Sequence, residues 1–331
     1  MLTEDDLQSA VLAGVVSAEA VEALRQHAAS RRATPVVDEE HFRLITGFND
    51  VFVVIACVLL LVSVAWIGNA VAPWAGGLAV AVCAWGLAEF FVRQRHMALP
   101  AIVLLVAFVG GLFASLVGSS VDHKGVMGVV AAFAVALGAW LHWKRFHVPI
   151  TVAAGSAALV GAVWLLLLQT FPTLKDWFVP LALVCGLVVF YVALRWDASD
   201  TARRTGRSDV AFWLHLLAAP LLVHPLFTSL VVSGDGVALG GAAVVLLAYT
   251  AIAMVSLVID RRALMVSALG YVLYAFSALL KQYGSVSLGF AMTALVIGSA
   301  LLLLSAFWHS TRTALLRRVP AGVQRYIAPL Q

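Results

Sequence analysis

The stretch FNDVFVVIACVLLLVSVAWIG, residues 48–68, decides the fold class of this protein. After Asn49 and Asp50 it continues to Gly68 without a charged side chain. A helix needs about 20 apolar residues to cross the core of a bilayer. Backbone N–H and C=O groups in lipid must be paired within their own segment, which a helix achieves. The stretch therefore predicts a transmembrane helix.

Similar apolar stretches fill most of the chain. Hydrophobic residues make up 63% of the 331 positions and charged residues 11%, whereas soluble domains carry roughly 25% charged residues. Charged residues, Pro and Gly divide the chain into predicted spans at 49–68, 72–92, 98–119, 126–143, 149–171, 177–196, 210–230, 237–259, 263–281 and 285–308. The sequence therefore predicts an all-α, polytopic integral membrane protein with about ten transmembrane helices.

The distribution of basic residues predicts the orientation. All but three of the 21 Lys and Arg residues lie in the N-terminal segment, the C-terminal tail or alternate loops, and the exceptions are Lys124, Lys175 and Lys281. Short loops rich in Lys and Arg stay on the cytoplasmic side. We therefore predict that both termini are cytoplasmic.

Segments 1–47 and 309–331 flank the ten-span domain, which occupies 48–308. The first lacks the features of a signal peptide, so we expect no cleavage. It predicts two short amphipathic helices, with Thr3 and Ser17 as N-caps and Gly14 ending the first. This cytosolic helical hairpin could bind a protein partner, or it could pack on the membrane domain.

The segment GVVSAEAVEAL, residues 14–24, and the first span at 48–68 carry a resemblance. Together they resemble the N-terminal part of uncharacterised bacterial polytopic membrane proteins, classed as domains of unknown function. The resemblance covers the hairpin and the first span only. It implies a multi-pass protein of the bacterial inner (cytoplasmic) membrane and assigns no activity.

The basic tail is expected to lie at the membrane surface. It contains Arg312, Arg317, Arg318 and Arg325 among apolar residues, and anionic lipid attracts each such side chain with about 1 kcal/mol. Because topology accounts for the positive charge, we expect lipid rather than nucleic acid as the partner.

Motifs of enzymes are absent from the sequence: it has no HExxH, CxxC, GxSxG, P-loop or glycine-rich nucleotide fingerprint. Cys57, Cys83 and Cys185 lie singly in apolar spans, which is typical of small buried hydrophobes. We therefore expect no catalytic residue, cofactor or metal site. An intramembrane enzyme ranks below a transporter and below a scaffold or sensor as the predicted function.

Two histidines lie in the seventh span, in FWLHLLAAPLLVHPLF at 212–227. His215 and His224 are nine positions apart and point to opposite sides of a straight helix, so they cannot bind one metal together. Pro220 and Pro225 each free a backbone carbonyl, with which the rings or neighbouring helices could pair. The histidines are therefore either internal hydrogen-bonding groups or part of a proton relay or ligand site.

Other polar residues gather in the eighth and ninth spans. Ser267, Tyr271, Tyr274 and Lys281 recur along one face of the ninth, and Tyr249 lies in the middle of the eighth. These tyrosines could simply hydrogen-bond between packed helices. The alternative is a cavity or proton relay among spans seven to nine, with candidate residues His215, His224, Tyr249, Tyr271, Tyr274 and Lys281.

Two acids lie near span ends. Asp50 occupies a first helical turn, where the helix dipole favours an acid, and Glu89 can pair with Arg93 four residues later. Both therefore have structural explanations. As candidate intramembrane acids, they could instead share a proton or an ion.

Similar octets suggest an internal repeat. The segments RQRHMALP at 93–100, WKRFHVPI at 143–150 and DRRALMV at 260–266 resemble one another, and each lies where the chain enters a predicted span from the cytoplasmic side. This recurrence indicates a repeated helical hairpin. The sequence leaves undecided whether the ten spans form an inverted repeat of two five-helix halves, as in many transporters. The glycine pairs 76–77 and 110–111 predict close packing of helices.

We favour a transporter or permease for a small solute, because polar residues cluster in several spans without a catalytic motif. The competing prediction is a non-catalytic scaffold or sensor that has a dry, filled bundle and binds a partner through its N-terminal hairpin.

Overall fold

The computed structural model describes residues 9–23, 48–119, 124–201, 203, 205–232, 239–283 and 306–318, with scattered positions from 295 onward. The chain divides into two units, Met1–Arg43 and Leu44–Gln331. In the first, residues 9–12 and 18–23 are helical. Ser17 Oγ accepts the Ala20 N–H at 3.1 Å, and Gly14 has φ +69°, which confirms this N-cap and this helix end. Thr3 lies outside the described residues.

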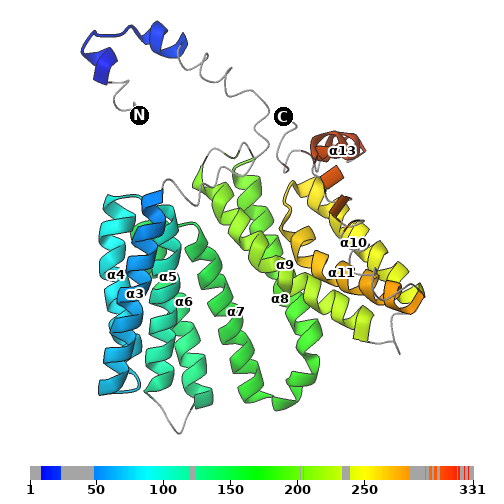
Figure 1. The fold of residues 1–331 in the computed structure, drawn as a ribbon, viewed down its shortest axis with the longest axis horizontal. Coiled ribbons are helices and arrows are strands. Elements are labelled where there is room, and N and C mark those ends of the chain that lie inside the picture. Colours follow the sequence, from blue (N-terminus) through cyan, green and yellow to red (C-terminus); the bar gives the residue numbers. More distant parts are fainter. Residues whose placement is uncertain are drawn as a thin grey trace. The chain divides into compact units, whose positions relative to one another are not determined.

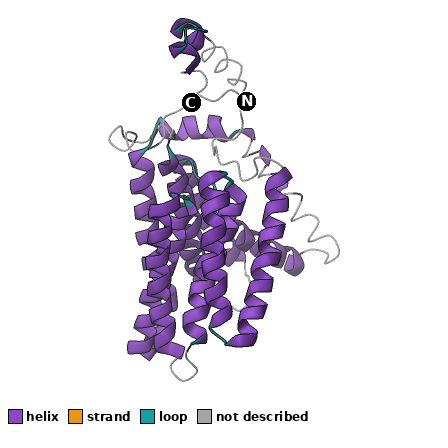
Figure 2. Cartoon of the chain, turned by 90° about the vertical axis from the view of Figure 1, so that its left-hand side faces the viewer, coloured by secondary structure: helices purple, strands orange, loops and turns teal. Residues whose placement is uncertain are grey.

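The second unit is built of helices, and its described part contains no strand (Figures 1 and 2). Their bounds are α3 Phe48–Val71, α4 Ala75–Ala88, η1 Glu89–Gln94, α5 Ala98–Gly118, α6 Lys124–Phe146, α7 Ile150–Thr170, η2 Pro172–Trp177, α8 Phe178–Ser199, α9 Gly206–Val232, α10 Leu239–Ile259, α11 Ala263–Tyr283 and α13 Trp308–Leu316. Among the described residues, seven helices are long and apolar enough to cross a membrane, and Leu247–Ile259 and Ala263–Leu273 are shorter apolar helices. The protein is thus an α-helical polytopic membrane protein.

The observed helices correspond closely to nine of the predicted spans. The largest difference lies at α9, which begins at Gly206 rather than at 210, and α4 begins at Ala75 and continues into the π-helical turn η1. The tenth predicted span, 285–308, falls almost wholly outside the described residues. The number ten therefore stays a prediction.

Most helices that follow one another pack against each other, whereas α7 and α8 are joined through η2, and α9 also contacts α7, α10 and α11. One close approach involves glycines of α4 and α5. A Cβ atom on Gly77 would lie 2.6 Å from the Gly111 carbonyl oxygen, and one on Gly111 would lie 2.6 Å from the Gly77 carbonyl oxygen. The predicted small-residue contact is thus observed for Gly77 and Gly111. Gly110 faces open space.

Four turns at one end of the helices share an unusual backbone conformation. His96, His147, Arg203 and Asp260 have φ values of 52°, 53°, 53° and 61°. Each lies between two helices that follow one another in the chain (Figure 1). We call this end, which carries most of the basic loops, the basic end. The recurrence supports the predicted hairpin repeat.

Candidate functional site

A buried group of charged side chains joins three segments at the basic end. Asp197 lies in the last turn of α8, and its Oδ2 atom is 2.7 Å from Nε2 of His215 on α9. Its Oδ1 atom accepts a hydrogen bond at 2.7 Å from Nη2 of Arg261, in the α10–α11 turn. The same Nη2 donates to the Ser208 carbonyl at 3.0 Å. His215 is wholly buried, and the Asp197 side chain is 13% exposed.

Asp260, which precedes Arg261 in the α10–α11 turn, is a second carboxylate and pairs with two further arginines. Asp260 Oδ2 accepts a hydrogen bond at 2.9 Å from Arg203, and Oδ1 accepts one at 2.8 Å from Trp308 Nε1. Arg312 Nε lies 3.7 Å from Oδ1. Arg203 also donates to the Asp260 main-chain carbonyl at 3.0 Å. These contacts fix α13 and the α8–α9 turn to the α10–α11 turn.

We call these six residues the ionic cluster: Asp197, Arg203, His215, Asp260, Arg261 and Arg312. Desolvation offsets much of the Coulombic attraction of a buried ion pair, so such a pair is weak evidence for a stabilising role. Removing one partner nevertheless leaves a costly unpaired charge. Ionisable groups in membrane segments are therefore functional candidates by default.

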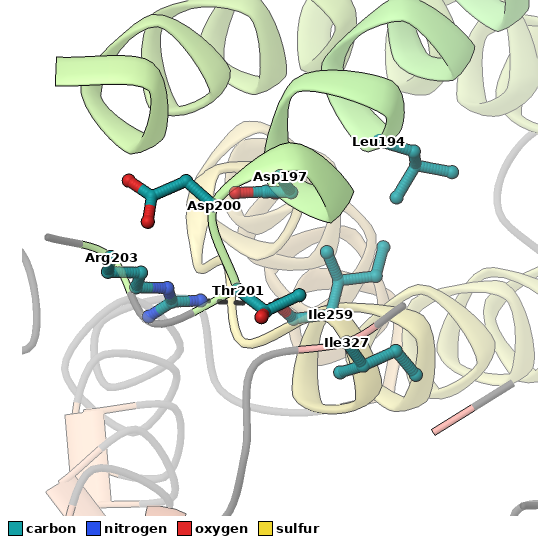
Figure 3. Close-up of a pocket in the computed structure, with 7 residues that line it drawn as sticks. All are labelled: Leu194, Asp197, Asp200, Thr201, Arg203, Ile259 and Ile327. Atoms are coloured by element: carbon teal, nitrogen blue, oxygen red, sulfur yellow. Dashed lines mark hydrogen bonds between the residues drawn. The ribbon is translucent and has the colours of Figure 1, made fainter. Parts of the chain in front are cut away.

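A pocket lies beside the ionic cluster (Figure 3). Its lining residues are Leu194, Asp197, Asp200, Thr201, Arg203, Ile259 and Ile327. It holds about 310 Å³ of empty space, including its solvent-facing mouth. Asp200 accepts hydrogen bonds from the Thr205 N–H at 2.8 Å and the Thr205 hydroxyl at 2.7 Å, which shapes the turn. Asp197 thus contacts both this pocket and the buried imidazole.

The predicted histidines belong to two different places. His215 joins the ionic cluster, whereas Nδ1 of His224 is hydrogen-bonded to the Tyr271 hydroxyl on α11. Phe227, which is fully buried, stacks on the Tyr271 ring with centroids 5.1 Å apart. Both histidines therefore bond side chains of neighbouring helices and not the carbonyls that Pro220 and Pro225 release.

The region between α9, α10 and α11 is packed with side chains. Val223, Phe227, Ala268 and Val272 form a buried apolar cluster, against which Tyr249 and Tyr271 pack. The Tyr249 hydroxyl is buried and has no hydrogen-bond partner among the described residues. The Tyr274 and Lys281 side chains lie outside the described part, so their place in a polar stripe stays a prediction.

The two candidate acids of the first half, Asp50 and Glu89, lie in different helices and have different surroundings. Asp50 is buried in the first turn of α3. Glu89 accepts hydrogen bonds from Arg145 at 2.7 and 3.0 Å and from Arg93 at 3.4 Å, which confirms the predicted pair with Arg93. These two arginines compensate the negative charge of Glu89. That Glu89 and Asp50 share a proton or an ion stays a prediction.

Another buried histidine did not emerge from the sequence. His142 on α6 is wholly buried, and its Nδ1 lies 3.2 Å from the Thr151 hydroxyl on α7. The rings of Trp85, Phe108 and Phe146 surround it, with centroids 4.5 to 5.8 Å away. Its Nε2 atom has no partner in the described part. The sequence signal that could have identified His142 is the occurrence of a histidine within the predicted span 126–143.

A metal centre finds no support in this arrangement. Within the described ranges, no three His, Cys, Asp or Glu side chains converge where a metal ion could bind. The three cysteines are unpaired thiols, and Cys57 is buried.

Comparisons with family models, curated proteins and solved structures found no match to this chain. The resemblance of its N-terminal part to uncharacterised bacterial membrane proteins therefore stays a prediction.

Proposed function

We propose that this protein is a membrane transporter for a small solute, and that the ionic cluster closes the solute path at the basic end. The observation that carries the proposal is the contact of Asp197 with both the buried His215 and Arg261. This contact joins the α8–α9 hairpin to the α10–α11 turn. Ion pairs between packed elements can break and re-form as two conformations interconvert, so they suit a reversible closure.

The helix α9 is suited to move in such a change. Pro220 and Pro225 lie inside it, and each removes a backbone hydrogen bond, which allows a transmembrane helix to bend. Side chains fill the space among α9, α10 and α11 in the described conformation. A solute cavity near His224, Tyr249 and Tyr271 would therefore open in a second conformation.

A change in water access at the core of α9 tests this proposal. We would place a single cysteine at Ala218, which is wholly buried against α7 and α8, in a chain with Cys57, Cys83 and Cys185 replaced by alanine. In detergent-solubilised protein, we expect no reaction with a membrane-impermeant maleimide while the ionic cluster is intact. Combining Asp197→Asn with Arg261→Gln should make Ala218→Cys reactive, because both charges leave together and the closure loosens.

The control cysteine replaces Thr201, which lines the pocket and should react in both backgrounds. A scaffold or sensor with a permanently dry bundle is the second candidate, and the packed core around Ala218 favours it. Reaction of Ala218→Cys only after denaturation, in both backgrounds, would exclude the transporter and support the scaffold. An unchanged elution volume in size-exclusion chromatography shows that the neutralised variant stays folded.

We further propose that the protein lies in a bacterial inner membrane with both termini in the cytoplasm. The basic loops support this orientation, because Lys and Arg are retained on that side. A cysteine replacing Asp176, which is exposed in η2, should react with impermeant maleimide on intact spheroplasts. Thr201→Cys should react only after the membrane is permeabilised. The reverse pattern would contradict the orientation.

We also propose that anionic lipid contacts the exposed Arg317 and Arg318 of the tail. The buried Arg312 is directed to Asp260 instead. The N-terminal hairpin stays a candidate site for a protein partner.

A further inference from the structure

Exposed aromatic rings contact basic side chains near the basic end of α6 and α8. On α6, the Nζ atom of Lys144 lies 4.0 Å from the centroid of the Trp140 ring. On α8, Nη1 of Arg195 donates a hydrogen bond to the Tyr191 hydroxyl at 3.3 Å. Both rings and both basic side chains are exposed. In each pair the cation lies four residues closer to the basic end than its ring, which places both on one face of the helix.

A third pair reaches the same arrangement through a different backbone geometry. Arg95, directly after η1, has its guanidinium carbon 5.5 Å from the centroid of the exposed Phe90 ring, five residues earlier. The Arg95 N–H donates to the Phe90 carbonyl at 3.1 Å, which is the five-residue hydrogen bond of a π-helix. The π-helical turn therefore places residues five apart on one face. We call Arg95, Lys144 and Arg195 the ring-paired cations.

Two basic neighbours of the ring-paired cations are paired in another way. Arg93 in η1 and Arg145 on α6 both contact the Glu89 carboxylate, at 3.4 and 2.7 Å. The contacts described for the ring-paired cations are with aromatic rings. A ring attracts a cation but carries no net charge, so it does not cancel the positive charge. The ring-paired cations therefore keep their full charge and most of their N–H donors.

The surroundings of Trp140 place its partner cation at the membrane surface. Leu137 and Leu141, which flank Trp140 on α6, are also exposed, as expected of a surface that faces lipid chains. Trp and Tyr rings are enriched where lipid chains meet headgroups. Lys144 lies in the last turn of α6, about 6 Å along the helix from Trp140, and a lysine near a helix end extends toward the interface. Its ammonium group therefore reaches the layer of lipid phosphates.

We propose that the ring-paired cations bind the phosphate groups of anionic lipids, one lipid at each cation. The N–H groups donate charge-assisted hydrogen bonds to phosphate oxygens, and the ring contacts the adjoining glycerol and acyl chain. Anionic lipid fits better than phosphatidylcholine, because the choline group of the latter already compensates its phosphate. This inference goes beyond the proposed transport function and beyond lipid contacts of the tail. It assigns one lipid site to each of the hairpins α4–α5, α6–α7 and α8–α9.

Lipid titration followed by native mass spectrometry tests the proposal on the full-length protein in detergent. The probe is dioleoyl phosphatidylglycerol, and the double variant combines Arg95→Gln with Lys144→Gln. We expect the cumulative binding constant for this lipid to fall about fivefold for each charge removed, which is the contribution of one basic side chain near anionic lipid. Binding of dioleoyl phosphatidylcholine should stay unchanged. An unchanged affinity for phosphatidylglycerol, or an equal loss for both lipids, would overturn the proposal.

The matched control combines Arg93→Gln with Arg145→Gln. It removes the same number of charges from the same two elements, but these arginines already contact Glu89. We expect the affinity for phosphatidylglycerol to change less than about twofold, because compensated and exposed ion pairs have small effects. Losses of equal size in the two double variants would show that the lipid responds to total charge and would overturn the assigned sites. The tail is intact in both variants, and an unchanged elution volume shows that they are folded.

Inorganic phosphate in the same titration distinguishes a lipid site from a site for a free anion. It offers the same oxygens without a chain that could contact the ring, so we expect it not to displace phosphatidylglycerol. Displacement would assign the sites to a free anion and overturn the lipid. Lys144→Arg keeps the charge and the ring contact and should retain the wild-type affinity, whereas a loss as large as that of Lys144→Gln would contradict binding through charge. These results do not depend on solute movement, so they stand or fall separately from the proposed transporter.

Discussion

Replacing Gly111 by alanine is expected to destabilise the protein strongly. The new Cβ would lie 2.6 Å from the Gly77 carbonyl oxygen and 2.9 Å from the Ala81 nitrogen, both main-chain atoms of α4. Backbone atoms cannot rotate away as a side chain can, so α4 and α5 must separate. Overpacking of this kind costs about 1–3 kcal/mol or more. The midpoint of thermal unfolding in detergent, measured as loss of the monodisperse chromatography peak, should fall clearly.

The adjacent residue provides a matched control. A Cβ on Gly110 would meet no atom within 4 Å, and alanine is favoured over glycine inside a helix by roughly 0.5–1 kcal/mol. Gly110→Ala should therefore leave the unfolding midpoint unchanged or raise it. Equal midpoints for Gly110→Ala and Gly111→Ala would contradict the observed contact between α4 and α5.

Asp260→Asn is expected to have the largest effect among charge substitutions. Asp260 is buried and pairs with the buried Arg312 and with Arg203, whose side chain is 9% exposed. Asparagine preserves the size of the side chain and tolerates the positive φ of this residue, so the substitution removes the charge and one of the two oxygens that accept hydrogen bonds from Arg203 and Trp308. Loss of one partner in a buried pair costs about 3–5 kcal/mol. Unfolding by a denaturing detergent should show a decrease of this size.

Glu89→Gln serves as the comparison for this charge substitution. Glu89 also binds two arginines, but the Arg93 and Arg145 side chains are 55% and 44% exposed. Exposed ion pairs contribute little to stability because water and salt screen them. We therefore expect almost no change for Glu89→Gln. A similar loss for Asp260→Asn and Glu89→Gln would show that burial does not set the cost.

The membrane helices could be predicted from the sequence because the requirement that creates them is local. Each span must be apolar over its own length and must pair its own backbone groups. Charged residues and Pro therefore marked most ends correctly. The predicted end at 196 lies three residues before the observed end of α8 at Ser199. It leaves Asp197 outside the span, where the rule that marks ionisable groups within spans does not apply.

The ionic cluster could be predicted only in small part. His215 was identified because histidine is rare in an apolar span. Its partner Asp197 lies 18 residues before it in the chain, and Arg261, which binds the same carboxylate, lies 46 residues after it. No spacing rule connects residues that meet only through tertiary packing. The same limit applies to His224 and Tyr271, which were both candidates although their contact was not foreseen. Topology explains the basic loop that contains Arg203, and lipid contact explains the basic tail that contains Arg312. Neither explanation predicts that both arginines pair with Asp260.

The four turns with positive φ have a mechanical consequence. Each joins two helices through a very short connection, so the pairs α4–α5, α6–α7, α8–α9 and α10–α11 are tethered tightly at the basic end. Neither member of a pair can slide far along its companion there. Relative displacement at the basic end must therefore occur between pairs rather than within them. The Asp197–Arg261 and Asp260–Arg203 contacts lie between the α8–α9 and α10–α11 pairs. A small rearrangement of these contacts would therefore change how the two pairs are placed relative to each other.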